Sequence, residues 1–216
     1  MHHVNPTRLL LALAVTGIAG LTACGGREVP DIAEEAWDGP LDMPSRYSGV
    51  DRMVAIGDLH GDLGAARAAL QRAGAMDHQD HWIGGDLTLV QTGDILDRGD
   101  DAIEILDLLD GLAEQAQAVG GMVHLLNGNH ELMNVKLDMR YVSVGGFIDF
   151  LPEIGADPAT ATAQDVVDGV AARILAVRPG GSLALRFAER NTVSIIGETV
   201  FVHGGVLPHV ADYGID

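Results

Sequence analysis

The sequence of 216 residues predicts an α/β domain, because short apolar runs alternate with helical patterns and end in site-like residues. Three of these runs occupy residues 53–56, 87–92 and 122–126. Each run is followed closely by a glycine and then by Asp58, Asp94 or Asn129, at nearly equal intervals of about 35 residues. Such intervals fit one strand–helix–strand unit per motif. Since ligands gather at the carboxyl ends of parallel strands, we expect these side chains to share one edge of a sheet.

Helical signals separate the predicted strands. Asp62 has the chemistry of an N-cap, and an apolar face with helical spacing follows it. Asp100 and Asp101 open a longer amphipathic helix, which Gly120 and Gly121 should end. These patterns predict one helix after each of the first two strands.

The second half of the chain is expected to complete the fold around the same edge. Residues 143–190 are predicted to form mainly helix and loop, with a helix over 162–177. We find no candidate catalytic or metal-ligand residues there. This stretch is interpreted as an insertion that shapes the substrate face. Residues 193–202 predict a β-hairpin that delivers His203 to the core.

The net charge of the chain limits the classes of binding partner. A formal charge of -18 argues against nucleic acid, whose phosphate backbone requires lysine and arginine. The same charge gives no support for binding an anionic membrane surface through the protein itself. Bound divalent cations would reverse the sign locally and admit a phosphate.

The N-terminus predicts a targeting segment. An apolar stretch at residues 9–20 is too short to span a bilayer and suits a signal-peptide core. Cys24 follows it and is the single cysteine, so no disulfide can form within one chain. The segment resembles a bacterial lipoprotein signal, which implies a signal peptide over 1–23 and an acylated N-terminus with a tether over 24–50. An ordinary secretory signal is the alternative.

By that resemblance, the protein is expected in a bacterial cell envelope, anchored to the membrane by lipid on Cys24. Gly25 would favour the periplasmic side of the outer membrane if the cell is Gram-negative.

Four segments carry the site chemistry, and each combines glycines with metal-ligand side chains: 57–62, 93–99, 128–131 and 202–205. Carboxylate, imidazole and amide oxygen together suit Mn, Fe or Zn better than calcium. A shared carboxylate can hold two such cations about 3.5–4 Å apart, where a water loses its proton and attacks phosphorus. The segments therefore predict a site with two divalent metal ions for phosphoester hydrolysis.

These four segments resemble the signature segments of calcineurin-like metallophosphatases of the phosphoprotein phosphatase type. Residues 133–135 and 140–142 are similar to the corresponding stretches of Shewanella-like protein phosphatases. The resemblance implies helices that flank a central β-sandwich, within a metallophosphoesterase domain over 51–216.

The resemblance also implies individual roles. The first metal would take Asp58 and His60, and the second would take Asn129 and His203, with Asp94 as the bridge. The remaining implied residues act on the substrate. They are His130 as general acid, Asp97 as the residue that orients it, and Arg98 as a clamp on phosphate oxygens.

Other residues receive more ordinary interpretations. Residues 77–81 look metal-like but are expected to form a solvated loop, His124 to lie in the core, and His209 to lie on the surface. Resemblance makes Asn134, Arg140 and Tyr141 candidates for substrate contact.

The chain departs from the family pattern after His203. Members carry a further ligand histidine downstream, and nothing before Asp216 matches it. We therefore expect a fragment in which the C-terminal strands are missing and the second metal position is incomplete. A naturally shortened protein is the alternative.

Three functions remain open. The leading hypothesis is a metal-dependent phosphomonoesterase that acts on a phosphorylated protein or a small phosphoester. The first alternative is a nucleotide or dinucleoside polyphosphate hydrolase. The second is an envelope-anchored module that binds metal or phosphate without catalysis.

Overall fold

The computed structural model describes residues 43–212 and residue 214. The predicted signal peptide, Cys24 and most of the predicted tether lie outside the described residues. Within the described part, no helix has both the length and the apolar character needed to cross a bilayer.

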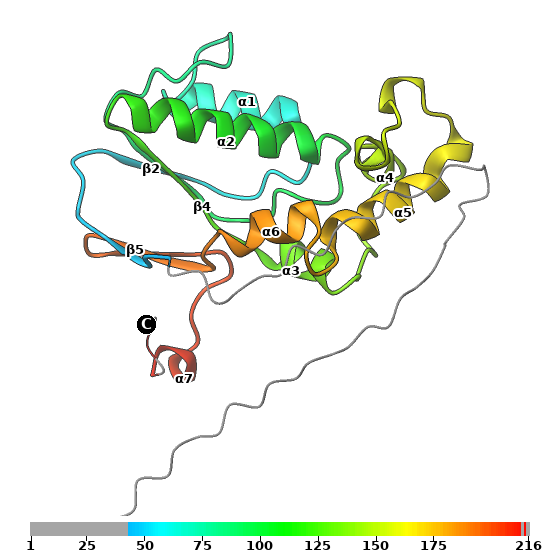
Figure 1. The fold of residues 1–216 in the computed structure, drawn as a ribbon. Coiled ribbons are helices and arrows are strands. Elements are labelled where there is room, and N and C mark those ends of the chain that lie inside the picture. Colours follow the sequence, from blue (N-terminus) through cyan, green and yellow to red (C-terminus); the bar gives the residue numbers. More distant parts are fainter. Residues whose placement is uncertain (1–42, 213, 215–216) are drawn as a thin grey trace, which may run out of the picture. The chain divides into compact units, whose positions relative to one another are not determined.

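Three parallel strands form the sheet that supports the site (Figure 1). They are β2 (Met53–Ile56), β3 (Thr88–Gln91) and β4 (Met122–Leu125), in the order β2-β3-β4. The strands start level with one another, because Met53 pairs with Thr88 and Thr88 pairs with Met122. The parallel α/β core predicted from the three apolar runs is therefore confirmed, and the carboxyl ends of all three strands meet at one edge.

Two helices pack against one face of this sheet, α1 (Leu63–Arg72) and α2 (Ala102–Ala118). The carboxylate of Asp62 caps α1 by accepting a hydrogen bond from the backbone N–H of Ala65 at 2.8 Å, as the sequence predicts. Helix α2 ends just before Gly120 and Gly121, also as predicted.

A second sheet has the order β1-β5-β6, built from β1 (Arg46–Tyr47), β5 (Val193–Ile196) and β6 (Thr199–Val202). β5 and β6 form the predicted antiparallel hairpin, and Gly197 turns it with a φ of 59°. A small apolar cluster joins the two sheets and contains Val90, Leu126 and Ile196. The sandwich-like arrangement of two sheets with flanking helices is thus confirmed.

Strand β3 lies in both cores. Leu89 belongs to the main cluster under α1 and α2, whereas Val90 belongs to the small cluster between the sheets. Successive side chains of a strand point to opposite faces, and both faces of β3 are buried, including its polar side chains Thr88 and Gln91. This placement explains why the run shows no alternation of polar and apolar residues.

A short strand lies within the stretch that was expected to form a tether. β1 lies inside residues 24–50, which were expected to form a tether with little regular structure, and it pairs in parallel with β5. The backbone N–H of Ile195 also donates to the carbonyl of Ser45 at 2.8 Å. No sequence signal indicates this strand, because two residues are too short to show any periodicity.

The remaining helices follow the sheet edge or fill the insertion. The short helix α3 (Asn129–Val135) begins at the third motif, and α7 (Pro208–Ala211) follows the hairpin. The insertion contains α4 (Val144–Ile148), α5 (Val166–Val177), α6 (Ser182–Ala188) and the 3-10 turns Leu151–Ile154, Pro158–Thr160 and Ala163–Asp165. The helix expected over 162–177 therefore begins as a 3-10 turn and becomes α-helical at Val166.

Candidate metal centre

The three strand ends bring the predicted ligands together. Asp58 follows β2, Asp94 follows β3, and Asn129 begins α3 just beyond β4. The loops can approach closely because they contain glycine: a Cβ on Gly128 would lie only 2.1 Å from Oδ1 of Asp94. The shared edge predicted from spacing is confirmed.

Asp94 lies at the centre of the cluster and is buried. Its Oδ1 accepts a hydrogen bond from the backbone N–H of His130 at 2.9 Å. Its Oδ2 lies 3.1 Å from Nε2 of His203, and 3.8 Å from Nε2 of both His60 and His130. One carboxylate oxygen thus faces three imidazole nitrogens.

His60 is oriented as a metal ligand would be. Its Nδ1 donates to the carbonyl of Leu96 at 2.9 Å, which makes Nε2 the unprotonated nitrogen of a neutral ring. Nε2 is buried and has no hydrogen-bond partner among the described residues, although Oδ2 of Asp58 lies 3.5 Å away. A lone pair that faces carboxylate oxygens is unfavourable unless a cation lies between them.

His203 repeats this arrangement from the hairpin. Its Nδ1 donates to the carbonyl of Thr92 at 3.1 Å, so its Nε2 lone pair faces two oxygens. These are Oδ2 of Asp94 and Oδ1 of Asn129, each 3.1 Å from Nε2. In proteins, ligand histidines commonly bind metal through one nitrogen while the other donates to a backbone carbonyl.

The residues therefore fit divalent cations. The ligand atoms fall into two groups that share Asp94, one with His60 and His130 and one with Asp58 and His203. A carboxylate common to two groups is the arrangement that a pair of metals needs. His130 lies as close to Asp94 as His60 does, so the division between ligands and general acid stays a prediction.

His130 is held by a buried polar network. Its Nδ1 donates to Oδ2 of Asp97 at 2.7 Å, as expected for a carboxylate that orients an imidazole. Asp97 also accepts from Nδ2 of Asn134 at 3.0 Å and from Nη2 of Arg173 at 2.6 Å. All four side chains are buried.

Two expectations are corrected by this network. Asn134 was a candidate for substrate contact, but it is fully buried and binds Asp97 and Arg173 instead. The insertion was expected to carry no site chemistry, yet its helix α5 supplies Arg173. A lone arginine in an apolar helix gave no sign of its partner 76 residues away in the sequence.

Glu131 is a second residue whose role the sequence did not reveal. Its carboxylate is 0% exposed and accepts four backbone N–H bonds. Oε2 accepts from Asp94 at 2.9 Å and Gly128 at 2.7 Å, and Oε1 accepts from Ile95 and Leu96 at 2.9 and 3.2 Å. Glu131 therefore ties the second motif loop to the third. Its position at the start of a helix next to His130 was the one available signal.

The backbone is strained at the site. His60, Asp94, Asp97 and Arg98 all have positive φ values, at 45°, 59°, 68° and 68°. Residues other than glycine adopt this region rarely and at a cost of about 1–3 kcal/mol each. Hydrogen bonds hold these conformations: Glu131 accepts from the backbone N–H of Asp94, while the N–H groups of His60 and Arg98 donate to the carbonyls of Asp94 and Tyr141.

A cleft of about 430 Å³ opens onto the cluster. Arg98, Arg140 and Tyr141 line it, together with Met133 and the metal-ligand candidates. Among the described residues no acid pairs with the Arg98 guanidinium, whereas Arg140 is held by Asp138 through two hydrogen bonds of 2.7 and 2.8 Å. The ring of Tyr141 lies 5.2 Å from that of His130. Arg98, Arg140 and Tyr141 thus line the same cleft as Asp94 and His203.

The residues with ordinary interpretations behave as expected. Asp77 accepts from the backbone N–H groups of Gln79 and His81 in a surface loop. These bonds lower the pKa of Asp77. His209 is exposed in α7.

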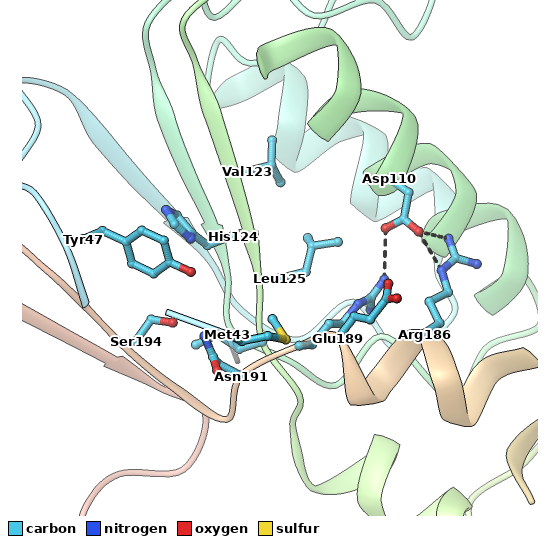
Figure 2. Close-up of a pocket in the computed structure, with 12 residues that line it drawn as sticks. Met43, Tyr47, Asp110, Val123, His124, Leu125, Arg186, Glu189, Asn191 and Ser194 are labelled. Carbon is cyan, nitrogen blue, oxygen red and sulfur yellow. Dashed lines mark hydrogen bonds and ion pairs between the residues drawn. The ribbon is translucent and has the colours of Figure 1, made fainter. Parts of the chain in front are cut away.

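A second cleft, of about 260 Å³, lies beside β4 (Figure 2). It is lined by His124, Tyr47, Asp110 and Arg186 among others, and the rings of His124 and Tyr47 are 4.2 Å apart. His124 is buried as predicted, and burial lowers its pKa. None of the ligand-type clusters found in the described part of the chain lies here.

The fold and the ligand set define an α/β metalloprotein domain with its site at the strand ends of a sandwich. The family model for calcineurin-like phosphoesterases matches residues 52–212, and the chain belongs to this family. The family resemblance inferred from the four segments is confirmed.

Curated relatives agree with this placement. The chain is 39% identical to Shewanella-like protein phosphatase 2 of Arabidopsis thaliana over 202 residues, which cover 81% of the chain and 51% of that protein. It is 36% identical to Shewanella-like protein phosphatase 1 of Plasmodium berghei over 92 residues, or 43% of the chain and 25% of that protein. The predicted similarity to this group is confirmed.

Solved structures agree as well. A cold-active protein tyrosine phosphatase superposes with a TM-score of 0.63 at 28% identity and covers 81% of the chain. The structure of the cold-active protein-tyrosine phosphatase of a psychrophilic Shewanella species gives a TM-score of 0.62. The chain spans about half the length of these proteins, at 47% and 48%.

Proposed function

We propose that this protein is a metal-dependent phosphomonoesterase that acts on phosphorylated proteins. One observation carries the proposal: Oδ2 of Asp94 lies among three imidazole nitrogens. The cleft beside it contains Arg98, which has no acidic partner among the described residues. The similarity of the chain to Shewanella-like protein phosphatases supports the choice of a protein substrate.

Two divalent cations of the Mn, Fe or Zn type, when bound, would lower the pKa of a water and polarise the phosphoryl group. Asp58 and His60 would hold one and Asn129 and His203 the other, with Asp94 shared. Arg98 binds the phosphate oxygens, because its guanidinium is in the cleft and lacks an acidic partner among the described residues. A forked guanidinium matches phosphate oxygens well.

His130 protonates the leaving oxygen. Since Nδ1 of His130 donates to Asp97, Nε2 is the nitrogen that faces the cleft side of Asp94. The exposed ring of Tyr141 forms a wall next to His130 and provides apolar surface for the side chain that carries the phosphate.

Turnover measurements test the proposal. The purified chain, loaded with Mn²⁺, should release phosphate from phosphopeptides and from p-nitrophenyl phosphate, and a chelator should abolish the release. Asp94→Asn is the control for contaminating phosphatase. Faster hydrolysis of a dinucleoside tetraphosphate than of any phosphopeptide would favour the nucleotide hydrolase instead. Metal binding without turnover of either substrate would favour the non-catalytic module.

We also propose that lipid on Cys24 anchors the protein in the bacterial envelope. The motive is the sequence alone: an apolar segment at 9–20 followed by the single cysteine. Stable anchoring requires more than one acyl chain, as lipoproteins provide. Labelled palmitate should enter the wild type but not Cys24→Ser, which should move to the soluble fraction. An unlabelled and soluble wild type would instead indicate an ordinary cleaved signal.

A further inference from the structure

We infer that Arg173 is a positioning residue for catalysis, which fixes the Asp97 carboxylate and through it the imidazole of His130. The inference rests on the proposed phosphatase function and adds a residue from the insertion to that site. Arg173 lies on α5, outside all four motif segments.

Every nitrogen of the Arg173 guanidinium has a partner inside the protein. Nη2 donates to Oδ1 of Asp97 at 2.6 Å, Nε donates to Oδ1 of Asn134 at 2.8 Å, and Nη1 donates to the carbonyl of Gly146 at 2.7 Å. The guanidinium carbon also lies 4.4 Å from the centre of the Phe150 ring. Arg173 is 0% exposed, so it does not itself reach a substrate in the cleft.

The contacts form a closed set around Asp97. Oδ2 of Asp97 binds His130, Oδ1 binds Arg173, and Asn134 donates to both oxygens while it accepts from Arg173. Asn134 also donates to the carbonyl of His130 at 2.9 Å. Hydrogen bonds from Asn134 and Arg173 thus fix the orientation of the Asp97 carboxylate independently of His130.

This support matters because Asp97 sits in an unfavourable backbone conformation, with a φ of 68°. Without Arg173, the Asp97 carboxylate would lose the charged donor at Oδ1. It would keep Asn134 and His130 as partners, but the 2.7 Å bond to His130 would be less tightly fixed. A forked guanidinium restricts rotation of the carboxylate better than a single charged amine, because it offers several donors in fixed directions. Burial lowers the pKa of Arg173 to about 10, so the group is still charged at neutral pH.

Arg190 provides a matched control. It is also a buried arginine of the insertion region, and it also pairs with an aspartate, Asp110, at 3.1 Å. It lines the second cleft beside β4 and not the metal centre. Arg190→Met should therefore report what the loss of a buried arginine, and of its ion pair with the partly exposed Asp110, does to the protein in general.

The test compares Arg173→Met, Arg173→Lys and Arg190→Met with the wild type. Metal content, kcat and KM are measured on an alkyl phosphate and on p-nitrophenyl phosphate, whose leaving group needs little protonation. Loss of groups that support a site residue typically lowers activity about 10–100-fold. We expect a loss of this size in kcat for Arg173→Met on the alkyl phosphate, a much smaller loss on p-nitrophenyl phosphate, and unchanged metal content. The kcat of Arg173→Lys on the alkyl phosphate should lie between those of the wild type and Arg173→Met.

A second readout does not depend on activity. With diamagnetic Zn²⁺ in the site, the Nδ1–H of His130 should give a downfield proton NMR signal, assigned by its disappearance in His130→Asn. The signal should shift or broaden in both Arg173 variants and persist in Arg190→Met. If Arg173→Met fails to fold, Arg173→Lys decides both readouts.

The outcomes separate the inference from the function on which it rests. Equal losses on both substrates together with an unchanged NMR signal would overturn the positioning role while leaving the phosphatase proposal intact. An inactive wild type whose signal responds to Arg173 would overturn the phosphatase proposal and support the positioning role.

Discussion

Oδ2 of Asp94 lies 3.1 Å from Nε2 of His203, although one belongs to the parallel sheet edge and the other to the hairpin. Because Nδ1 of His203 donates to the Thr92 carbonyl, a neutral ring would present the lone pair of Nε2 to this carboxylate oxygen. The same applies to His60 on the other side of Asp94. The site is therefore organised for cations around one carboxylate.

Asp94→Asn should lose both metals and lower activity more than any other single carboxylate change. Loss of residues that only support a metal ligand already costs about 10–100-fold, so a shared ligand should cost more. Metal analysis after gel filtration, with Asp58→Asn beside it, measures this. Two retained metals with near-normal turnover would rule out the bridging role.

His130→Asn should keep its metals and lower kcat on alkyl phosphates by about 10²–10⁴-fold, the usual contribution of a general acid. The loss should shrink on p-nitrophenyl phosphate. Steady-state kinetics on both substrates check the difference. Equal losses, or loss of a metal, would mean that His130 serves another role, such as that of a ligand.

Glu131→Gln should destabilise the fold, because its carboxylate accepts four buried N–H bonds and an amide can accept only with its oxygen. Leaving buried donors unsatisfied should cost about 2–4 kcal/mol, which lowers Tm by about 5–15 °C in a protein of this size. Thermal unfolding measures the shift. Glu114→Gln, on the exposed face of α2, is the control and should leave Tm unchanged. A similar Tm for the two variants would contradict the structural role of Glu131.

Asp149→Asn should remove a pH dependence of stability. Burial raises the pKa of Asp149 to about 6, while its carboxylate accepts from the backbone N–H of Ile103 at 2.9 Å. Because the folded pKa lies above the unfolded value of 3.8, the folded state binds a proton more tightly. The stabilising contribution is thus complete below pH 3.8 and is lost as pH rises through about 6.

Urea unfolding of wild type and Asp149→Asn between about pH 4 and 7 measures this. The free energy of unfolding of the wild type, relative to the variant, should fall by about 1–3 kcal/mol as pH rises. The amide keeps an acceptor for Ile103 and does not titrate, so the difference isolates the carboxyl group. Parallel curves would show that Asp149 titrates alike in both states.

Several parts of the fold could be predicted from the sequence, because local signals specify them. The runs that end near Asp58, Asp94 and Asn129 had to be strands, and their spacing required parallel units. Parallel strands place their carboxyl ends together, so chain order predicted that Asp58, Asp94 and Asn129 would share one edge of the sheet.

The tertiary structure alone decided how those ligands are held. The partners of Arg173 and Glu131 lie 76 and up to 37 residues away, and no periodicity or spacing reports a pairing over such a distance. Asn134 was a candidate for substrate contact by resemblance, and only the packing of α5 showed that it bonds to Arg173. A buried polar group must find partners wherever the fold brings them, so these contacts depend on packing and not on local pattern.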